Sequence, residues 1–241
     1  MKLAQRRRAA MDPNFAFYHY LRDEIASRLV DRLADINKAF PVVVEIGSGS
    51  GAHVSKLLKP LSQPSQAALD ALKEAASTPL TNKNSSAASL PTSVKDRGVI
   101  KTLHICESCP EALERTKQYW ADHAADIPEG RHQEYHILDE EGEFPFPPGS
   151  VDLIISNMNM HWINDLPGFL KRCRRALKPD GVFLASMIGG SSLQELRSAL
   201  TVADMERLGG VNAHVSPFAY GRDCGDLLAV AGFNMPTSQY D

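Results

Sequence analysis

VVVEIGSGSG, residues 42–51, joins a run of apolar, mainly β-branched residues to three glycines at alternate positions. The run at 42–46 is typical of a buried strand in a parallel sheet. Glycines let the backbone turn tightly and approach a ligand without an intervening Cβ. Because ligands of such sheets bind beyond the carboxyl ends of the strands, we expect Gly47, Gly49 and Gly51 to form a ligand-binding loop. A tight turn that binds nothing is the alternative.

The pattern on both sides of this loop alternates between predicted helices and strands, which implies a doubly wound, mostly parallel α/β sheet. Apolar residues at spacings of three and four predict the helices, and short apolar runs predict the strands. Lys178-Pro179-Asp180-Gly181 predicts a turn. The predicted strands are 42–46, 99–105, 135–138, 151–156 and 182–186, and the predicted helices are 15–38, one through 54–58, 110–123, 166–177, 193–208 and one that includes 227–231.

Residues 60–98 differ in composition from the rest of the chain, since they are rich in Ser, Ala, Thr, Pro and Asn. We expect a mobile surface insertion there, with a short helix at 66–76. The chain is accordingly expected to comprise an N-terminal helical segment, 1–40, that covers the ligand site, and one domain, 41–241.

Composition excludes several classes of protein. The net charge of −3 gives no reason to expect a nucleic-acid partner, and no stretch has the roughly 20 apolar residues of a transmembrane helix. Four cysteines are too few for a disulfide scaffold, which favours a reducing compartment. The basic start, MKLAQRRRAAM, fits either the remnant of a transit peptide or a solvated helix. Composition does not indicate an oligomeric state.

Acidic residues follow the second and third predicted strands. Glu107 can accept hydrogen bonds from both hydroxyls of a ribose, or it is a surface acid at a helix N-terminus. Asp139 can accept from an adenine amino group, although Glu140 and Glu141 compete for this role and a solvated acidic loop is the alternative. An adenosine-containing cofactor is therefore expected.

SNMNMHW, residues 156–162, follows the fourth predicted strand. His161 is the candidate general base or substrate-orienting group, and a packed core histidine is the alternative. Asn157 is a candidate cofactor contact. We expect no metal site, because Cys106 and Cys109 lack a second ligand pair and the other histidines lack metal-ligand spacing (His19, His53, His104, His132, His136 and His214).

The loop also fits a loose dinucleotide fingerprint, so a nicotinamide cofactor is an alternative. That fingerprint requires an acid about 20 residues further on. Here the first acid after the second strand is Glu107, beyond the insertion. Glu45 before the glycines also disfavours the nicotinamide reading.

Taken together, Glu45-x-Gly47-x-Gly49-x-Gly51, the acids at 107 and 139, and LKPDG at 177–181 resemble the class I S-adenosylmethionine-dependent methyltransferases. The resemblance implies the Rossmann-like fold of this class and S-adenosylmethionine as cofactor. It also implies that Tyr18 and Tyr20 lie on a helix that covers the pocket. The cofactor-binding residues it implies are Glu45, Gly47, Ser48, Gly49, Gly51, Glu107, Asp139 and Asn157.

Further segments resemble one subfamily, the mitochondrial NADH dehydrogenase (complex I) assembly factor 5 proteins, which are related to the bacterial malonyl-carrier-protein methyltransferases of biotin synthesis. These segments are RLVDRLADI at 28–36, SNMNMHWINDLP at 156–167, LKPDGVFLASMIGG at 177–190, SLQELRSAL at 192–200, HVSPF at 214–218 and LLAVAGF at 227–233. The resemblance covers nearly the whole chain except the insertion. Relatives continue with further C-terminal strands, so we expect this fold to be truncated at Asp241.

The subfamily implies an enzyme of complex I assembly that hydroxylates or methylates an arginine of a complex I subunit, on the matrix side of the mitochondrial inner membrane. One alternative is a carrier-protein or small-molecule O-methyltransferase. An acidic carrier protein would dock on basic residues of the helix at 166–177, where the candidates are Lys171, Arg172, Arg174 and Arg175. Another alternative is a non-catalytic assembly chaperone that retains the cofactor pocket.

Overall fold

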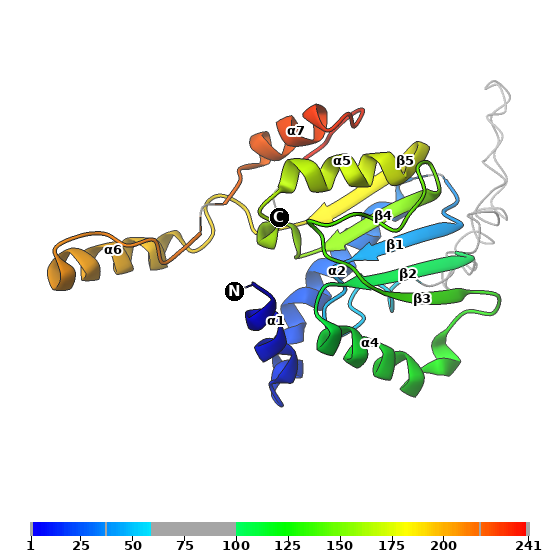
Figure 1. The fold of residues 1–241 in the computed structure, drawn as a ribbon, viewed down its shortest axis with the longest axis horizontal. Helices are drawn as coiled ribbons and strands as arrows, with labels where there is room; N and C mark the ends of the chain where they lie inside the picture. Colours follow the sequence, from blue (N-terminus) through cyan, green and yellow to red (C-terminus); the bar gives the residue numbers. More distant parts are fainter. Residues whose placement is uncertain (1, 37, 59–99, 217, 240–241) are drawn as a thin grey trace, which may run out of the picture.

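The computed structural model describes residues 2–36, 38–58, 100–216 and 218–239 (Figure 1). Its centre is a five-stranded sheet of order β3-β2-β1-β4-β5 in which every neighbouring pair is parallel. The expected α/β fold with a parallel sheet is therefore confirmed. The strands are β1 (Val42–Ile46), β2 (Thr102–Glu107), β3 (His132–Ile137), β4 (Val151–Asn157) and β5 (Leu177–Ser186).

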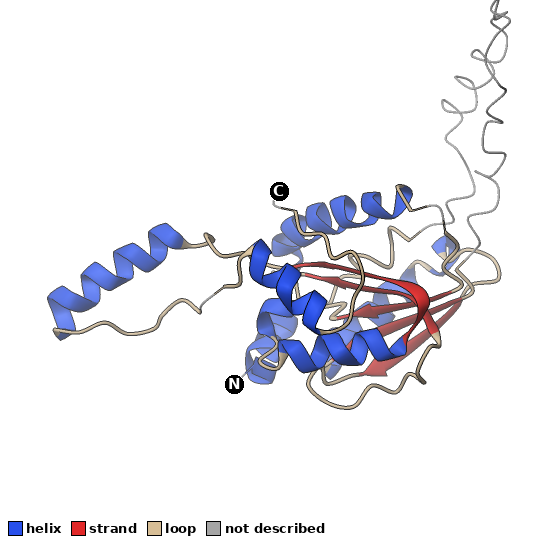
Figure 2. Cartoon of the chain, turned by 90° about the horizontal axis from the view of Figure 1, so that it is seen from above, coloured by secondary structure: helices blue, strands red, loops and turns tan. Residues whose placement is uncertain are grey.

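Helices lie on both faces of the sheet (Figures 1 and 2). The described helices are α1 (Lys2–Met11), α2 (His19–Ala34), α4 (Pro110–Asp122), α5 (Leu166–Ala176), α6 (Gln194–Leu208) and α7 (Gly221–Val230), with 3-10 turns at Phe15–Tyr18, Ala124–Asp126 and Met160–Trp162. The basic N-terminal stretch thus forms α1. None of the described helices is both long and apolar enough to cross a bilayer.

The core has two parts, one on each face of the sheet. On one face, Leu29 of α2 and Leu113 of α4 pack against Leu103 and Leu153 of the strands. On the other, Phe169 of α5 packs against Ile154 and the neighbouring apolar side chains. Each strand sends alternate side chains to the two faces, so the whole of β4 is buried, as its apolar run VDLII predicts.

The fifth strand starts earlier than the sequence predicts. Residues 178–181 belong to β5, but the pairing with β4 jumps from Val151↔Leu177 to Leu153↔Val182, so these residues bulge out of register. The positive φ of this bulge falls on Asp180 (62°) and not on Gly181. The prediction of a turn before the strand was therefore wrong, because these residues form a bulge within β5.

The helix expected at 54–58 is replaced by turns. Residues 50–57 form successive turns that include hydrogen bonds from Lys56 N to the oxygen of Ala52 (3.0 Å) and from Leu58 N to the oxygen of Val54 (3.2 Å). The expected insertion at 60–98, with its helix at 66–76, lies outside the described residues.

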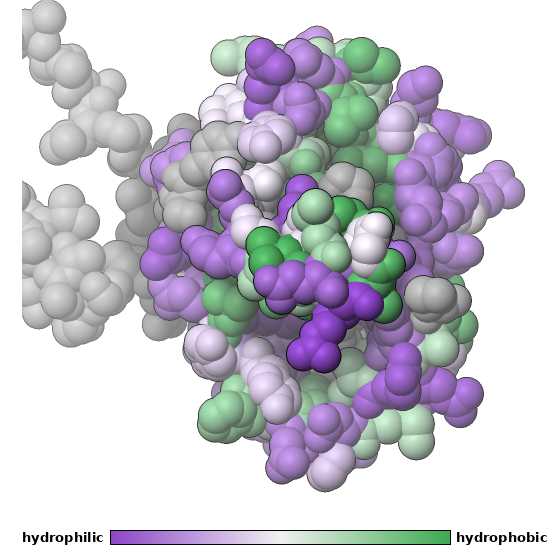
Figure 3. All heavy atoms as spheres, turned by 90° about the vertical axis from the view of Figure 1, so that its left-hand side faces the viewer, coloured by the Kyte–Doolittle hydropathy of each residue, from purple (hydrophilic) through white to green (hydrophobic). Residues whose placement is uncertain are grey.

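The helix α6 projects away from the sheet (Figure 1). Its exposed apolar side chains include Leu196, Val202, Met205 and Leu208. Figure 3 shows the molecule from the side toward which α6 projects. Hydrophobic and hydrophilic residues lie next to each other on the surface nearest the viewer. The apolar side of α6 is therefore in contact with solvent.

Candidate functional site

The glycine loop follows β1 at the carboxyl edge of the sheet. Gly47 (φ 75°) and Gly49 (φ 67°) have left-handed backbone conformations, which side chains disfavour. A Cβ on Gly49 would lie 2.6 Å from Nη1 of Arg22, and one on Gly51 would lie 2.7 Å from the ring of His19. Backbone conformation therefore favours glycine at 47 and 49, and the close approach of α2 side chains leaves no room for a Cβ at 49 and 51.

Glu107 lies beside this loop, at the end of β2, and is 4% exposed. Its Oε2 accepts a hydrogen bond from Gly49 N (2.8 Å), and its Oε1 accepts from the backbone N–H of Ser108 (3.0 Å) and of Cys109 (3.1 Å). These donors fix the carboxylate between the glycine loop and the N-terminus of α4, as expected for an anion at a helix N-terminus.

A guanidinium group from α1 lies against the same carboxylate. Nη1 of Arg6 is 3.2 Å from Oε1 of Glu107 and 2.6 Å from Oε1 of Glu140, and it also donates to the hydroxyl of Ser108. Nη2 donates to Oδ1 of Asn159 (2.5 Å). Arg6 thus ties α1 to residues that follow β2, β3 and β4.

The helix α2 covers the other side of the loop. Asn157 holds it there, because its Nδ2 donates to the backbone oxygen of Arg22 (3.0 Å) while its Oδ1 accepts from the hydroxyl of Ser186 (2.7 Å). Burial lowers the pKa of Arg22, and the negative charge of Glu107 acts in the opposite direction. The α2 side chains over the loop are those of His19 and Arg22.

The two tyrosines expected over the pocket lie elsewhere. Tyr18 is 63% and Tyr20 is 72% exposed, so both point to solvent. The periodicity that identified the N-terminal helix was sound, but its pocket-facing positions are offset from the tyrosines. Sequence reasoning gave no reason to select His19 or Arg22.

Glu45 is buried, and it supports the segment after the loop. Its carboxyl group accepts hydrogen bonds from the side chain of Ser55 and the backbone of Val54. Burial raises the pKa of Glu45 to about 7, against the effect of these bonds and of the Arg131 charge. Ser48, the other polar residue expected here, is also buried, and its N–H donates to the oxygen of Cys106 (3.2 Å).

The acidic run after β3 divides between the site and the surface. Asp139 is exposed, and its Oδ1 accepts from the N–H of Glu141. Glu141 forms an ion pair with Lys2 (2.9 Å). Glu140 is 1% exposed and faces Arg6 and Asn159, and its Oε2 has no hydrogen-bond partner among the described residues. Of the three acids, Glu140 is the one that the structure brings to the site.

His161 lies near the same group of charges. Burial lowers its pKa to about 4, and the positive charges of Arg22 and Arg6 contribute in the same direction. Its Nδ1 is buried without a hydrogen-bond partner in the described part of the chain. The imidazole is therefore neutral at pH 7, so it can accept a hydrogen bond but is a weak base.

Four groups at the site escaped the sequence analysis: Arg6, His19, Arg22 and Asn159. The triplet at 6–8 carries a pattern usual for a solvated helix face, and no local signal separates Arg6 from its neighbours. Asn159 lies within the SNMNMHW segment, two residues after Asn157. This position was the only feature of the sequence that could have pointed to a role at the site.

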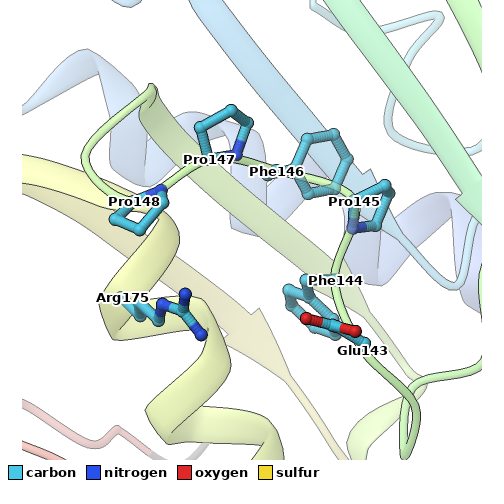
Figure 4. Close-up of a pocket in the computed structure, with 7 residues that line it drawn as sticks. All are labelled: Glu143, Phe144, Pro145, Phe146, Pro147, Pro148 and Arg175. Atoms are coloured by element: carbon cyan, nitrogen blue, oxygen red, sulfur yellow. The ribbon is translucent and has the colours of Figure 1, made fainter.

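A separate shallow pocket of about 450 Å³ lies on the loop between β3 and β4 (Figure 4). Phe144, Pro145, Phe146 and Pro147 are among its lining residues, and Arg175 of α5 faces this loop across the pocket (Figure 4). It shares no residue with the glycine loop.

Comparison with known proteins identifies the family of this chain. Residues 17–237 match the methyltransferase domain family. The chain belongs to this family.

Within the family, the chain is similar to the protein named arginine-hydroxylase NDUFAF5, mitochondrial, of Danio rerio, with 33% identity over 224 residues that cover 93% of this chain and 54% of that protein. It spans about half the length of the NDUFAF5 relatives that it matches. A malonyl-[acyl-carrier protein] O-methyltransferase of Xylella fastidiosa is 40% identical over 105 residues, covering 44% of this chain and 34% of that protein. The chain is thus an NDUFAF5-like member of the family, with carrier-protein methyltransferases as more distant relatives.

The fold agrees with solved structures. A SAM-dependent methyltransferase of Leishmania major superposes with a TM-score of 0.58 at 13% identity, over 96% of this chain and 71% of that chain. At this identity the likeness concerns the fold alone.

Proposed function

We propose that the chain binds S-adenosylmethionine at the carboxyl edge of β1, β2 and β4 and is an enzyme that uses it. The observation that carries this proposal is the buried carboxylate of Glu107, fixed beside the glycine loop by Gly49 N–H. A carboxylate in this position can accept hydrogen bonds from two ribose hydroxyls. The unpaired Oε2 of Glu140 offers a further acceptor to a donor such as an adenine amino group.

In such an enzyme the cofactor's sulfonium supplies an electrophilic methyl group, so the protein mainly positions the reactants and excludes water. The chain's own residues suit this task. Asn157 locks α2 over the loop, and Arg6 draws α1 over the carboxylates. The neutral imidazole of His161 can orient a substrate by accepting a hydrogen bond.

As substrate we propose an arginine of a complex I subunit, in the mitochondrion on the matrix side of the inner membrane. One observation supports it: the NDUFAF5 relatives are named arginine hydroxylases.

The carrier-protein alternative gains less from the structure. It needs free basic residues on α5, but Arg172 donates to the oxygen of Glu140 (2.8 Å) and Arg174 donates to the oxygen of Gly232 (3.0 Å). Two of the four candidate residues therefore already have partners within the chain.

Calorimetric titration with S-adenosylmethionine and S-adenosylhomocysteine tests the cofactor. We expect micromolar binding that is lost in Gly49→Arg, which clashes with Arg22, and in Glu107→Ala, with Glu114→Ala on the exposed face of α4 as control. A folded chain that binds neither compound would contradict the proposal.

Mass spectrometry of complex I subunits incubated with the chain and cofactor tests the substrate. A gain of one methylene on an arginine indicates methylation, and a gain of one oxygen, in an incubation that also contains dioxygen and a reductant, indicates hydroxylation. Cofactor binding without modification of any subunit would favour the chaperone alternative.

A further inference from the structure

Two histidines and a glutamate meet on the sheet, outside the site at its carboxyl edge. His104 lies on β2, and Glu134 and His136 lie on the adjacent strand β3. The parallel register pairs His104 with Glu134 and Cys106 with His136. Because alternate residues of a strand share a face, all three side chains emerge on the same side of the sheet.

The donor atoms of these side chains converge on one point. Nδ1 of His104 is 3.1 Å from Nε2 of His136 and 3.2 Å from Oε2 of Glu134, and the last two atoms are 3.5 Å apart. Ligands about 2.0–2.2 Å from a metal and roughly 90–110° apart around it are separated by about 2.8–3.6 Å. The triangle therefore has the dimensions of one face of a metal coordination shell.

The surroundings of the cluster favour a ligand set of this kind. The side chains of His104, Glu134 and His136 are 15%, 40% and 29% exposed, so the cluster is partly shielded but reachable from solvent. Phe146 covers it, with its ring centroid 5.2 Å from that of His104 and 5.8 Å from that of His136. The neighbouring His132 is 71% exposed and lies 3.4 Å from the other oxygen of Glu134.

We propose that His104, Glu134 and His136 bind one divalent transition-metal ion, of the kind that prefers imidazole, such as Zn²⁺ or Fe²⁺. Two imidazoles and one carboxylate leave further coordination positions for water or another ligand. The sequence analysis missed this set because its members come from two strands that are 25 positions apart in the chain, from Glu107 at the end of β2 to His132 at the start of β3. Only the spacing of two between Glu134 and His136 was visible.

This site is distinct from the proposed cofactor site. His104 precedes Glu107 by three residues on β2, which is about 10 Å along the strand. Metal binding is therefore measurable without any cofactor, and it does not depend on the proposed function.

The test uses the whole chain, without a histidine tag and stripped of metal by a chelator. Titration with Zn²⁺ alone should show one ion bound per chain and a rise in Tm. His136→Ala and Glu134→Gln should each weaken this binding by roughly 100-fold. Co²⁺ should give visible absorption bands typical of nitrogen and oxygen coordination in the native chain and lose them in both variants.

Two control variants distinguish binding at this cluster from nonspecific binding to surface histidines. His132→Ala, next to the cluster, and His123→Ala, on another element, should bind Zn²⁺ as the native chain does. Circular dichroism and urea unfolding should show that His136→Ala remains folded. The proposal is overturned if the folded native chain binds no ion, or if His136→Ala and Glu134→Gln both bind Zn²⁺ as tightly as the native chain.

Discussion

Glu45 and Glu107 are both buried carboxylates on neighbouring strands, but they differ in the number of hydrogen-bond donors around them. Glu107 accepts hydrogen bonds from three backbone N–H groups and from Arg6. Glu45 has fewer donors, and its Oε2 has no partner among the described residues. Burying an ionised carboxyl group without enough donors is costly, so Glu45 favours its protonated form.

This difference predicts a pH dependence of stability that resides in one residue. The pKa of Glu45 is raised from 4.5 to about 7, so its contribution to stability is fully present below pH 4.5 and is lost as the pH rises to about 7. Glu45→Gln cannot ionise. We expect the variant to gain stability relative to the native chain across this window, by up to about 3 kcal/mol.

Urea unfolding of both proteins at a series of pH values measures this difference. Glu114→Gln, an exposed glutamate on α4, serves as the control and should show no such trend. A stability difference between Glu45→Gln and the native chain that does not change with pH would contradict the assignment.

At the scale of elements, Arg6 links α1, and Asn157 links α2, to the carboxyl edge of the sheet. Removing Arg6 frees Glu107 and Glu140, the acceptors that we assign to the cofactor. Arg6→Ala should therefore bind S-adenosylhomocysteine more tightly than the native chain, by about 10-fold if the competition is worth about 1.4 kcal/mol. Calorimetry measures this change.

Arg7→Ala is the matched control, because Arg7 is one residue away and pairs with Glu111 at the surface. It should leave the affinity unchanged. Weaker binding by Arg6→Ala would instead show that Arg6 helps to hold the cofactor.

Asn157 links α2 to both β4 and β5 through two hydrogen bonds. Asn157→Ala leaves the backbone oxygen of Arg22 without this donor, at a cost of about 1–3 kcal/mol. A lower urea midpoint should accompany faster amide exchange in α2. The exposed Asn164→Ala tests for nonspecific effects, and an unchanged midpoint for Asn157→Ala would count against the link.

At the scale of the whole molecule, stability should be uneven. The helix α5 packs its apolar face on the sheet, whereas α6 projects into solvent with apolar side chains exposed (Figure 1). We expect amide hydrogens of α6 to exchange much faster than those of α5, since exchange follows local packing. Hydrogen-exchange mass spectrometry measures this, and equal protection of both helices would refute it.

The parallel sheet was predictable because its evidence is local. An apolar run such as VDLIIS predicts the burial of the strand that it forms. The glycines after β1 likewise indicate the backbone conformation at their own positions. The same holds for Glu107, which is the last residue of a strand.

Contacts between distant segments were not predictable from such patterns. Arg6 bonds to residues more than a hundred positions away in the chain, and nothing in the letters RRR marks it. Asp139 and Glu140 are adjacent acids on one loop, but the side chain of Glu140 points into the site and that of Asp139 points to solvent. The bulge at 178–181 depends on the register between β4 and β5, which the turn residues alone do not specify.

The position of Arg6 also has a kinetic consequence. If a ligand can reach Glu107 only after α1 has moved aside, opening precedes association, and the observed rate of binding cannot exceed the rate of opening. In stopped-flow measurements the rate would then rise with ligand concentration and level off at a plateau that belongs to the protein. That plateau would be the same for every ligand of the site, and it would vanish in a chain whose first helix carries no side chain long enough to reach the carboxylates.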